Sequence, residues 1–346
     1  MTHCFDRFQN MAAWIGFLGL LAGIALFASW LPAMAARPVN FMLNWVAGGD
    51  HAPYFYAKKM GWYKAAGLDV HLIQGTGSNV AVRRVAAGVD QIGLGDFPTM
   101  LLADGKGAEL IAVMATYANS PQGIYWLEGS GIKSVKDIVG RKIGNPSGDA
   151  ARVMWPALAK KIGIPVHSVT WVNIGPAAKI AALKAGIIDA TTDFYNGNYL
   201  YRRVFGENLR FLAWRDIGVN PYDNSIFVRA SYEKRHRETV AKFVQVTQKA
   251  FATCVATPQP CIKALIAANS GLRYSDELDN WHDVERLMST HSTQTVALGW
   301  FNPKRMTDTY RLVSRYLGVE KPFPITAAYT NQFLSKAYKM KPETLS

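Results

Sequence analysis

Aromatic rings and short polar side chains recur where the predicted strands of this sequence end, and these residues offer its clearest chemistry. The members are Asn44, Trp45, His51, Tyr54, Asp96, Phe97, Tyr117, Asp193, Phe194, Tyr195, Asn196, Tyr222 and Asp223. Rings stack on planar groups, and a buried Asp or Asn side chain needs a hydrogen-bonding partner. We therefore expect these side chains to bind a small planar heterocycle. The alternatives are core packing for the rings and helix capping for Asp96 and Asn196.

A second feature is the tight turn Ser147-Gly148-Asp149, which precedes a predicted helix. Backbone amides at the start of a helix can hold an anion. We therefore count Ser147 and Gly148 as candidate ligand-binding residues, with an ordinary helix cap as the alternative.

The sequence carries no recognisable catalytic or metal motif. It has no G-x-S-x-G, no Walker loop, no H-E-x-x-H and no C-x-x-C, and its histidines lack metal-ligand spacing. We therefore expect a binding protein and not an enzyme, with no cofactor and no metal.

The first candidate residues belong to one β-loop-α-β unit that spans Phe41 to Val70. Asn44, Trp45 and His51 follow its first strand, and Pro53 suits the first turn of the helix. Ligands of open α/β sheets bind at this carboxyl end of the strands. We therefore expect the rest of the chain to close against this edge.

Two later segments, 82–97 and 180–194, are similar to each other. Each reads as a helix, an Ala-Gly stop, a short strand and then Asp-Phe at the end of the strand. The pattern predicts two α/β lobes with a hinge and a ligand cleft between them. We expect residues 36–128 to form the first lobe, 129–223 the second, and 224–346 a mostly helical return to the first, with a last helix over 327–338.

Residues 1–35 are expected to be a signal peptide. Met11 to Leu31 is almost wholly apolar, and Ala33-Met34-Ala35 forms an A-x-A cleavage site. An uncleaved membrane anchor is the alternative, because the apolar run approaches the length of a span. The favoured interpretation is cleavage after about Ala35, which gives a freely soluble periplasmic protein.

Composition and charge narrow the class of protein. Of the 346 residues 49% are hydrophobic and 18% charged, as in globular proteins, and the formal net charge is +13. The charge could attract an anionic ligand or a membrane surface, but the basic residues are spread along the chain, which favours a solvated basic surface. No nucleic-acid-binding motif is present, so we expect no nucleic-acid partner.

Cys254 and Cys261 are the cysteines that remain after the leader. An oxidising compartment would allow a local disulfide between them. The equally plausible alternative is a pair of small buried apolar residues, because the sequence does not give the separation of their Cα atoms.

Several segments together resemble a known family. They are Leu43-Asn-Trp45, His51-Ala-Pro53, Gly61-Trp-Tyr-Lys-x-x-Gly-Leu-Asp69, Arg141-Lys-Ile-Gly144 and Ala328-Tyr-Thr-Asn331. The chain is similar to the family shared by thiamine-pyrimidine synthases and the periplasmic solute-binding proteins of ABC transporters, which include alkanesulfonate binders. The resemblance implies a two-lobed periplasmic-binding-protein fold of type II and, as partners, a small-molecule ligand with a transporter permease and ATPase. We expect a monomer.

The resemblance also bears on individual residues. Asn44 and Trp45 match family residues that contact the ligand ring, Tyr195 and Asn196 lie at the corresponding edge of the second lobe, and Ser147 and Gly148 match a phosphate-holding turn whose sequence differs here. The synthases have a lysine that binds pyridoxal phosphate and a histidine consumed as substrate. This chain has Gly95 and Thr99 at those positions, and no cysteine near Val219 to Phe227, where the synthases have a cysteine-rich run.

We therefore predict the substrate-binding component of an ABC importer that captures a thiamine-precursor pyrimidine, of the formylaminopyrimidine kind, by lobe closure. The same fold could instead bind an anionic sulfonate, an aromatic carboxylate or a flavin. A synthase-type enzyme is the third alternative.

Overall fold

The computed structural model describes residues 36–341, so the signal peptide expected over residues 1–35 lies outside the described residues. The strands form two five-stranded sheets, one for each lobe. The first sheet has the order β2-β1-β3-β10-β4 and consists of β1 (Arg37–Met42), β2 (Leu68–Ile73), β3 (Ile92–Asp96), β4 (Leu110–Ala115) and β10 (Asn224–Arg229). The second has the order β7-β6-β8-β5-β9 and consists of β5 (Gln122–Leu127), β6 (Lys142–Asn145), β7 (Thr170–Asn173), β8 (Ala190–Phe194) and β9 (Leu209–Ala213).

The two sheets share one topology. In the first, β1 runs parallel to β2 and β3, and β10 runs antiparallel to β3 and β4. In the second, β6 runs parallel to β7 and β8, and β5 runs antiparallel to β8 and β9. The antiparallel strand is β10 in the first sheet and β5 in the second. Each is the first strand that the chain forms after it crosses from the other lobe. This reciprocal exchange confirms the predicted two-lobed α/β architecture.

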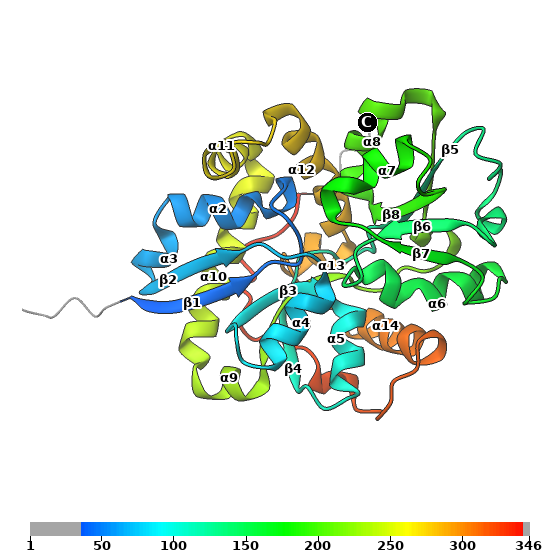
Figure 1. Cartoon of the computed structure of the whole chain (residues 1–346). Helices are drawn as coiled ribbons and strands as arrows, with labels where there is room; N and C mark the ends of the chain where they lie inside the picture. Colours follow the sequence, from blue (N-terminus) through cyan, green and yellow to red (C-terminus); the bar gives the residue numbers. More distant parts are fainter. Residues whose placement is uncertain (1–35, 342–346) are drawn as a thin grey trace, which may run out of the picture. The chain divides into compact units, whose positions relative to one another are not determined.

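Helices cover both faces of each sheet (Figure 1). Their bounds are α2 (Ala52–Lys59), α3 (Trp62–Ala65), α4 (Ser78–Ala86), α5 (Phe97–Asp104), α6 (Ala150–Ile162), α7 (Lys179–Lys184), α8 (Asn198–Phe205), α9 (Ala230–Arg235), α10 (Arg237–Ala256), α11 (Pro258–Ala268), α12 (Tyr274–Met288), α13 (His291–Thr295) and α14 (Pro303–Tyr316). Short 3-10 turns lie at Gly49–His51, Val135–Ile138, Pro176–Ala178, Tyr195–Gly197, Gly206–Asn208, Trp214–Ile217 and Ile325–Ala327.

Strand β1 contributes side chains to two hydrophobic cores, one on each face of the first sheet. Val39 and Phe41 face the core shared with α2, α10, α11 and α12, while Met42 faces the core shared with α4, α5 and α14. Successive side chains of a strand point to opposite faces of its sheet. In the second lobe, α6 covers one face of the sheet, and α7 and α8 cover the other.

The first lobe boundary differs from the one expected at residue 128. Strand β5 pairs with β8 and β9, so it belongs to the second sheet. The chain therefore crosses between Ala115 and Gln122, and the glycine-rich stretch after β5 is a turn within the second lobe. The apolar pattern of Gly123 to Leu127 identifies a buried strand but not the sheet that it joins.

The two crossing segments lie side by side. The amides of Thr116 and Tyr117 both donate to the Asn224 carbonyl over 2.9 Å, and the Ser120 amide donates to the Asn220 side chain over 2.8 Å. Because each segment bonds to the other, a hinge at this point bends both segments together.

The helix expected over 327–338 is not formed. Asn331 instead donates to and accepts from the backbone of Phe301, each over 2.9 Å, and the Thr330 amide donates to the Ala112 carbonyl. Backbone bonding to the edge of the first sheet thus takes the place of helical hydrogen bonds.

Cys254 and Cys261 form a disulfide that ties the end of α10 to the start of α11. Within residues 36–341, no single helix is long and apolar enough to cross a bilayer; α10 and α11 pass that test only as a pair, bent by 116°.

Candidate functional site

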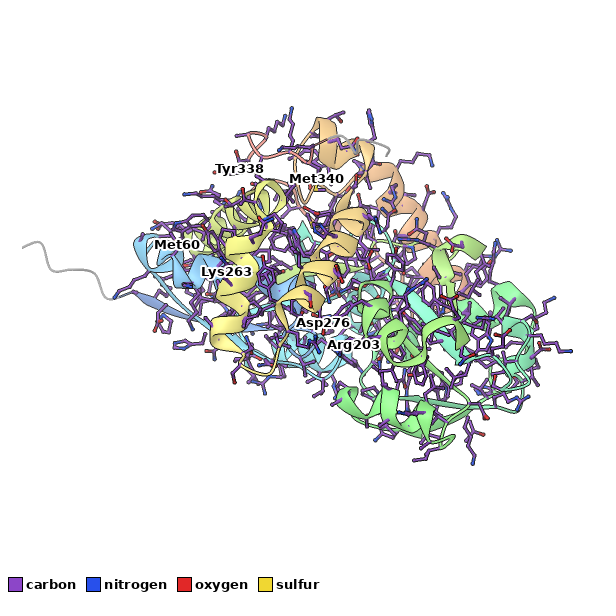
Figure 2. All side chains as sticks on the ribbon, turned by 90° about the horizontal axis from the view of Figure 1, so that it is seen from above. Met60, Arg203, Lys263, Asp276, Tyr338 and Met340 are labelled. Carbon is purple, nitrogen blue, oxygen red and sulfur yellow. A yellow bond between two sulfur atoms is a disulfide. The ribbon has the colours of Figure 1, made fainter. Side chains whose placement is uncertain are left out.

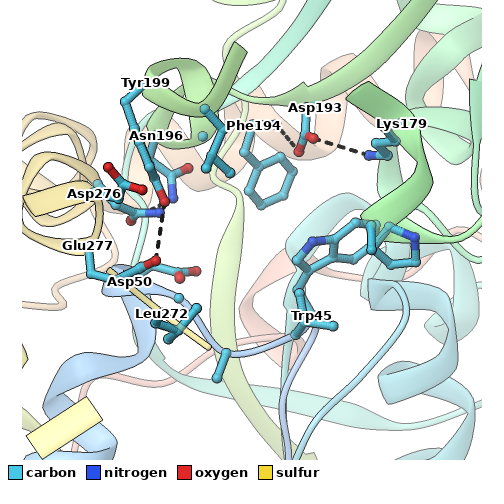
Figure 3. Close-up of a pocket in the computed structure, with 18 of the residues that line it drawn as sticks. Trp45, Asp50, Lys179, Asp193, Phe194, Asn196, Tyr199, Leu272, Asp276 and Glu277 are labelled. Atoms are coloured by element: carbon cyan, nitrogen blue, oxygen red, sulfur yellow. Dashed lines mark hydrogen bonds and ion pairs between the residues drawn. The ribbon is translucent and has the colours of Figure 1, made fainter. Parts of the chain in front are cut away.

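A cavity of about 450 Å³ lies between the two lobes, at the ends of their strands (Figure 3). The first lobe contributes the segment after β1, Gly77 and Ser78 at the start of α4, and the first half of α12 with the residues before it. The second lobe contributes the starts of α6 and α7 and the residues from the end of β8 into α8. The cavity therefore occupies the place where open α/β sheets bind ligands.

Lys179 dominates one corner of the cavity. Its ammonium lies 3.2 Å from Asp149 Oδ2 and 3.5 Å from Asp193 Oδ2, and it donates to the Thr192 carbonyl over 2.8 Å. It also lies 4.7 Å from the centre of the Trp45 ring, across the gap between the lobes. We call Trp45, Asp149, Lys179 and Asp193 the lysine corner.

The two carboxylates of the lysine corner keep Lys179 in its charged form. Burial alone would lower the pKa of Lys179, but the carboxylates of Asp193 and Asp149 outweigh it, so the pKa is raised. Burial raises the pKa of Asp149, while Lys179 opposes that shift. Lys179 is only 1% exposed and stays protonated, which makes it a fixed cation and not a free amine.

Acidic and amide groups form the opposite corner. Glu277 accepts from the Gly49 amide over 2.6 Å and from the Tyr199 hydroxyl over 3.4 Å, and Tyr117 donates to Asp50 over 3.1 Å. Burial raises the pKa of Glu277 from 4.5 to about 7, against the lowering effect of the Gly49 amide, and Asp50 adds to the rise. No lysine or arginine ion-pairs with Glu277 among the described residues.

Asn196 and Asn280 complete this corner. The Asn196 amide nitrogen donates to Asn280 over 3.1 Å, which joins the second lobe to α12. The Asn196 oxygen is buried and has no partner within the described residues. A buried acceptor of this kind calls for a donor from a ligand or water. We call Asp50, Asn196, Glu277 and Asn280 the glutamate corner.

Five of the sequence-predicted residues line this cavity: Asn44, Trp45, Asp193, Phe194 and Asn196. His51 lies behind Asn44, with Nε2 3.1 Å from the Asn44 side-chain oxygen, and Tyr117 reaches the cavity only through Asp50. These two residues support lining groups and do not line the cavity themselves.

Other predicted residues lie in the cores of the lobes and do not line the cavity. Tyr54 packs against Phe41 and Phe251, and Phe97 and Tyr222 pack against Phe301. Their rings are fully buried in the cores, so no face is free to stack on a ligand.

Two predicted acids and Tyr195 also lie outside the cavity lining. Asp96 caps α5 by accepting from the Thr99 amide over 2.7 Å, and Asp223 accepts from Ser120 in the crossing segments over 3.4 Å. The Tyr195 hydroxyl accepts from Arg286 over 3.4 Å. For Asp96 the structure therefore shows the helix-capping alternative.

Ser147 and Gly148 line a second cavity, of about 480 Å³, and not the first. The Ser147 amide donates to the Asn173 side chain over 2.9 Å, and Asp149 caps the following helix with its carboxylate. The Ser147 amide is already hydrogen-bonded, and the Asp149 carboxylate places negative charge at the start of the helix. Both features oppose anion binding. These contacts favour the alternative of an ordinary helix cap.

Sequence reasoning did not select most of the residues that line the cavity. The missed side chains with evident chemistry are Asp50, Asp149, Lys179, Tyr199, Arg203, Asp276, Glu277 and Asn280. Asp193 and Phe194 were predicted because they end the strand of the segment that is similar to 82–97. Arg203 ion-pairs with Asp276 where α8 meets α12 (Figure 2). Among residues 36–341, no group of His, Cys, Asp and Glu side chains could hold a metal ion.

Comparison with known proteins places these features in context. A family model described as "NMT1/THI5 like" matches residues 49–260. The formylaminopyrimidine-binding protein of Halalkalibacterium halodurans is 22% identical over 67% of this chain and 71% of its own length. The 4-amino-5-hydroxymethyl-2-methylpyrimidine phosphate synthase of Legionella pneumophila is 23% identical over 86% of this chain and 92% of its own.

Solved structures share the fold. The alkanesulfonate-binding protein SsuA from Xanthomonas axonopodis, bound to MOPS, superposes with a TM-score of 0.65 at 16% identity, over 85% of this chain and 98% of its own. A Candida albicans protein described as having the generic periplasmic binding protein fold gives 0.65 at 15% identity, over 90% of this chain and 100% of its own. The lobes and cavity described above therefore belong to a periplasmic-binding-protein fold.

Proposed function

We propose, from the premise that this chain belongs to the NMT1/THI5-like family, that it is the solute-binding component of an ABC importer and captures a thiamine-precursor pyrimidine between its lobes. Export to the periplasm, and a permease with its ATPase as partners, are parts of the same proposal. The observation that carries it is a cavity of about 450 Å³ that both lobes line and that leaves hydrogen-bond acceptors, not cations, for a ligand. Cavities of roughly 300–1,000 Å³ suit small molecules.

The charge of the cavity argues against the anionic alternatives. Its lining carries the carboxyl groups of Asp50, Asp149, Asp193, Asp276 and Glu277 and the cations Lys179, Arg203 and Arg273. Each cation is paired with a lining carboxylate: Lys179 with Asp149 and Asp193, and both arginines with Asp276. A sulfonate, carboxylate or phosphate would meet surplus negative charge, although the whole chain is basic.

The glutamate corner supports a ligand with N–H donors. The carboxyl groups of Glu277 and Asp50 are acceptors of cavity-lining residues, and the unpartnered oxygen of Asn196 is buried in the same corner. An aminopyrimidine carries an amino group that donates and a flat ring. Trp45 and Phe194 supply aromatic surface from the two lobes (Figure 3).

The residues present do not fit a synthase that binds pyridoxal phosphate. Lys179 is the lysine among the described residues that line the cavity, and two carboxylates hold it protonated. An imine-forming lysine must lose its proton, which usually requires a lowered pKa. The groups in the cavity thus favour reversible binding over the chemistry of the synthase relatives.

The test is a thermal-shift panel on the chain from residue 36. We expect stabilisation by 4-amino-5-hydroxymethyl-2-methylpyrimidine and by its formylamino analogue, since a ligand that binds only the folded state raises the unfolding temperature. Stabilisation by an alkanesulfonate or a flavin, with none by either pyrimidine, would overturn the ligand assignment and retain the binding-protein fold. Incubation with pyridoxal phosphate should give no aldimine absorbance.

A further inference from the structure

Two glycines bring the backbones of the two lobes into direct contact. Gly77 lies in the loop before α4 of the first lobe, and Gly148 lies before α6 of the second. A Cβ atom added at Gly77 would lie 2.1 Å from the Gly148 carbonyl oxygen and 2.4 Å from its carbonyl carbon. The Asn79 amide donates to the same oxygen over 3.2 Å. Only a residue without a side chain allows this approach at position 77.

The lysine corner makes a second contact between the lobes next to the first. Asp149 follows Gly148 directly and holds Lys179, whose ammonium lies over the Trp45 ring of the first lobe. On the other side, the Gly77 amide donates to the Asn44 carbonyl over 2.8 Å, and Asn44 precedes Trp45. The glycine contact and the cation–π contact are therefore linked through adjacent residues in both lobes.

We infer that Gly77–Gly148 and Trp45–Lys179 form one interlobe clasp that holds the ligand cleft shut, and that Gly77 determines whether the lobes can reach the closed arrangement. The inference rests on the proposed function, because it assigns a role in ligand retention. Gly77 lines the first cavity and Gly148 the second, so the contact is the wall that separates them. Opening this wall gives the ligand an exit.

A side chain at position 77 would collide with backbone atoms of Gly148. Backbone atoms cannot move aside as the end of a flexible side chain can. Gly77→Ala should therefore keep the lobes apart without disturbing either core. The matched control is Gly67→Ala: Gly67 also has a positive φ, 79° against 143° at Gly77, but an added Cβ meets no atom within 4 Å. Both variants carry backbone strain, which is larger at Gly77 because its φ of 143° and ψ of 148° are essentially restricted to glycine, and only Gly77→Ala carries the collision.

The experiment measures the distance between spin labels at Met60→Cys and Ile187→Cys, two side chains that are 50% and 57% exposed on different lobes. Both lobes belong to the compact unit Arg37–Ser346, so the chain from residue 36 is used, with and without 4-amino-5-hydroxymethyl-2-methylpyrimidine. We expect a short-distance population in the parent and in Gly67→Ala that is lost in Gly77→Ala. Pyrimidine dissociation should be at least tenfold faster in Gly77→Ala.

The outcomes separate this inference from the proposed function. Equal distance distributions and equal dissociation rates in the two glycine variants would overturn the clasp. If the parent fails to bind the pyrimidine, the ligand assignment fails, while the ligand-free distance distributions still decide the clasp: the same distribution in both variants rejects it, and selective loss of the short distance in Gly77→Ala supports it.

Discussion

The lysine corner and the glutamate corner line the same cavity, but they differ in whether their charged groups have ion-pair partners. In the lysine corner one buried ammonium is held by two carboxylates, so the protein satisfies its own charges. In the glutamate corner Glu277 has a pKa raised to about 7, and the oxygen of Asn196 has no partner among the described residues. The comparison teaches that the second lobe's own carboxylates hold the cation that contacts Trp45 of the first lobe, while Glu277 has no cation beside it within residues 36–341 and can accept from a ligand.

The largest expected effect comes from Lys179→Met, which removes the cation and leaves the buried carboxylate of Asp149 and the partly exposed carboxylate of Asp193 without their ion-pair partner. Removing one partner of a buried ion pair destabilises a protein by about 3–5 kcal/mol, because an uncompensated charge stays behind. We expect a loss of that size in the free energy of unfolding, measured in urea. Lys184→Met is the control, because Lys184 is exposed on the same helix. A loss as small as that of the control would contradict a structural role for the lysine corner.

The pH dependence of stability tests the glutamate corner. Because the pKa of Glu277 is raised from 4.5 to about 7, the folded protein binds this proton more tightly than the unfolded chain does. Its contribution to stability is complete below about pH 4.5 and is lost as the pH rises through 7, by at most about 3 kcal/mol. Glu277→Gln should remove that loss. Asp96 and Asp104 have raised pKa values of about 6 and 7, so the difference between parent and variant is the quantity to measure.

Binding should respond to Glu277 in the opposite direction. An ionised Glu277 accepts a ligand N–H more strongly than a neutral one, so affinity for the pyrimidine should rise with pH toward 8 while stability falls. Glu277→Gln should weaken binding by about 1.5–3 kcal/mol, the contribution of a hydrogen bond to a charged group. Titration calorimetry at several pH values measures this effect, and an affinity in Glu277→Gln equal to that of the parent would show that the ligand lies elsewhere.

Trp45→Phe should have the smallest effect. It keeps an aromatic face for Lys179 and for the ligand but reduces the ring area, and a cation–π contact contributes about 0.5–2 kcal/mol. We expect a loss of affinity below about tenfold, with little change in unfolding. Trp171→Phe provides a comparison in the second lobe, away from the cavity. A complete loss of binding in Trp45→Phe would mean that the indole itself holds the ligand.

The sequence predicted the fold well because its signals are local. Strand ends, helix starts and the two similar segments led to the two lobes and to Asn44, Trp45, Asp193, Phe194 and Asn196. The sheet that Gln122–Leu127 joins depends on pairing with distant strands, which no local pattern specifies. Tertiary contacts also decide whether an acidic residue caps a helix, as Asp96 does, or lines the cavity, as Glu277 does, so the sequence does not separate the two roles.

The two corners of the cavity illustrate what remained hidden. Lys179 becomes a fixed cation only because Asp149 and Asp193, on other elements, close around it. Glu277 comes from a helix of the returning segment and meets Gly49 only in the folded protein. Neither residue has a motif around it, so tertiary contact alone assigns its role.

The most direct test of the central claim is calorimetric titration of the chain from residue 36 with 4-amino-5-hydroxymethyl-2-methylpyrimidine and, separately, with its phosphate ester. Because every lining cation is already paired, we predict that the free pyrimidine binds and that the phosphate binds at least a hundredfold more weakly. Tighter binding of the phosphate would contradict the charge assignment of the cavity and, with it, the proposed ligand class.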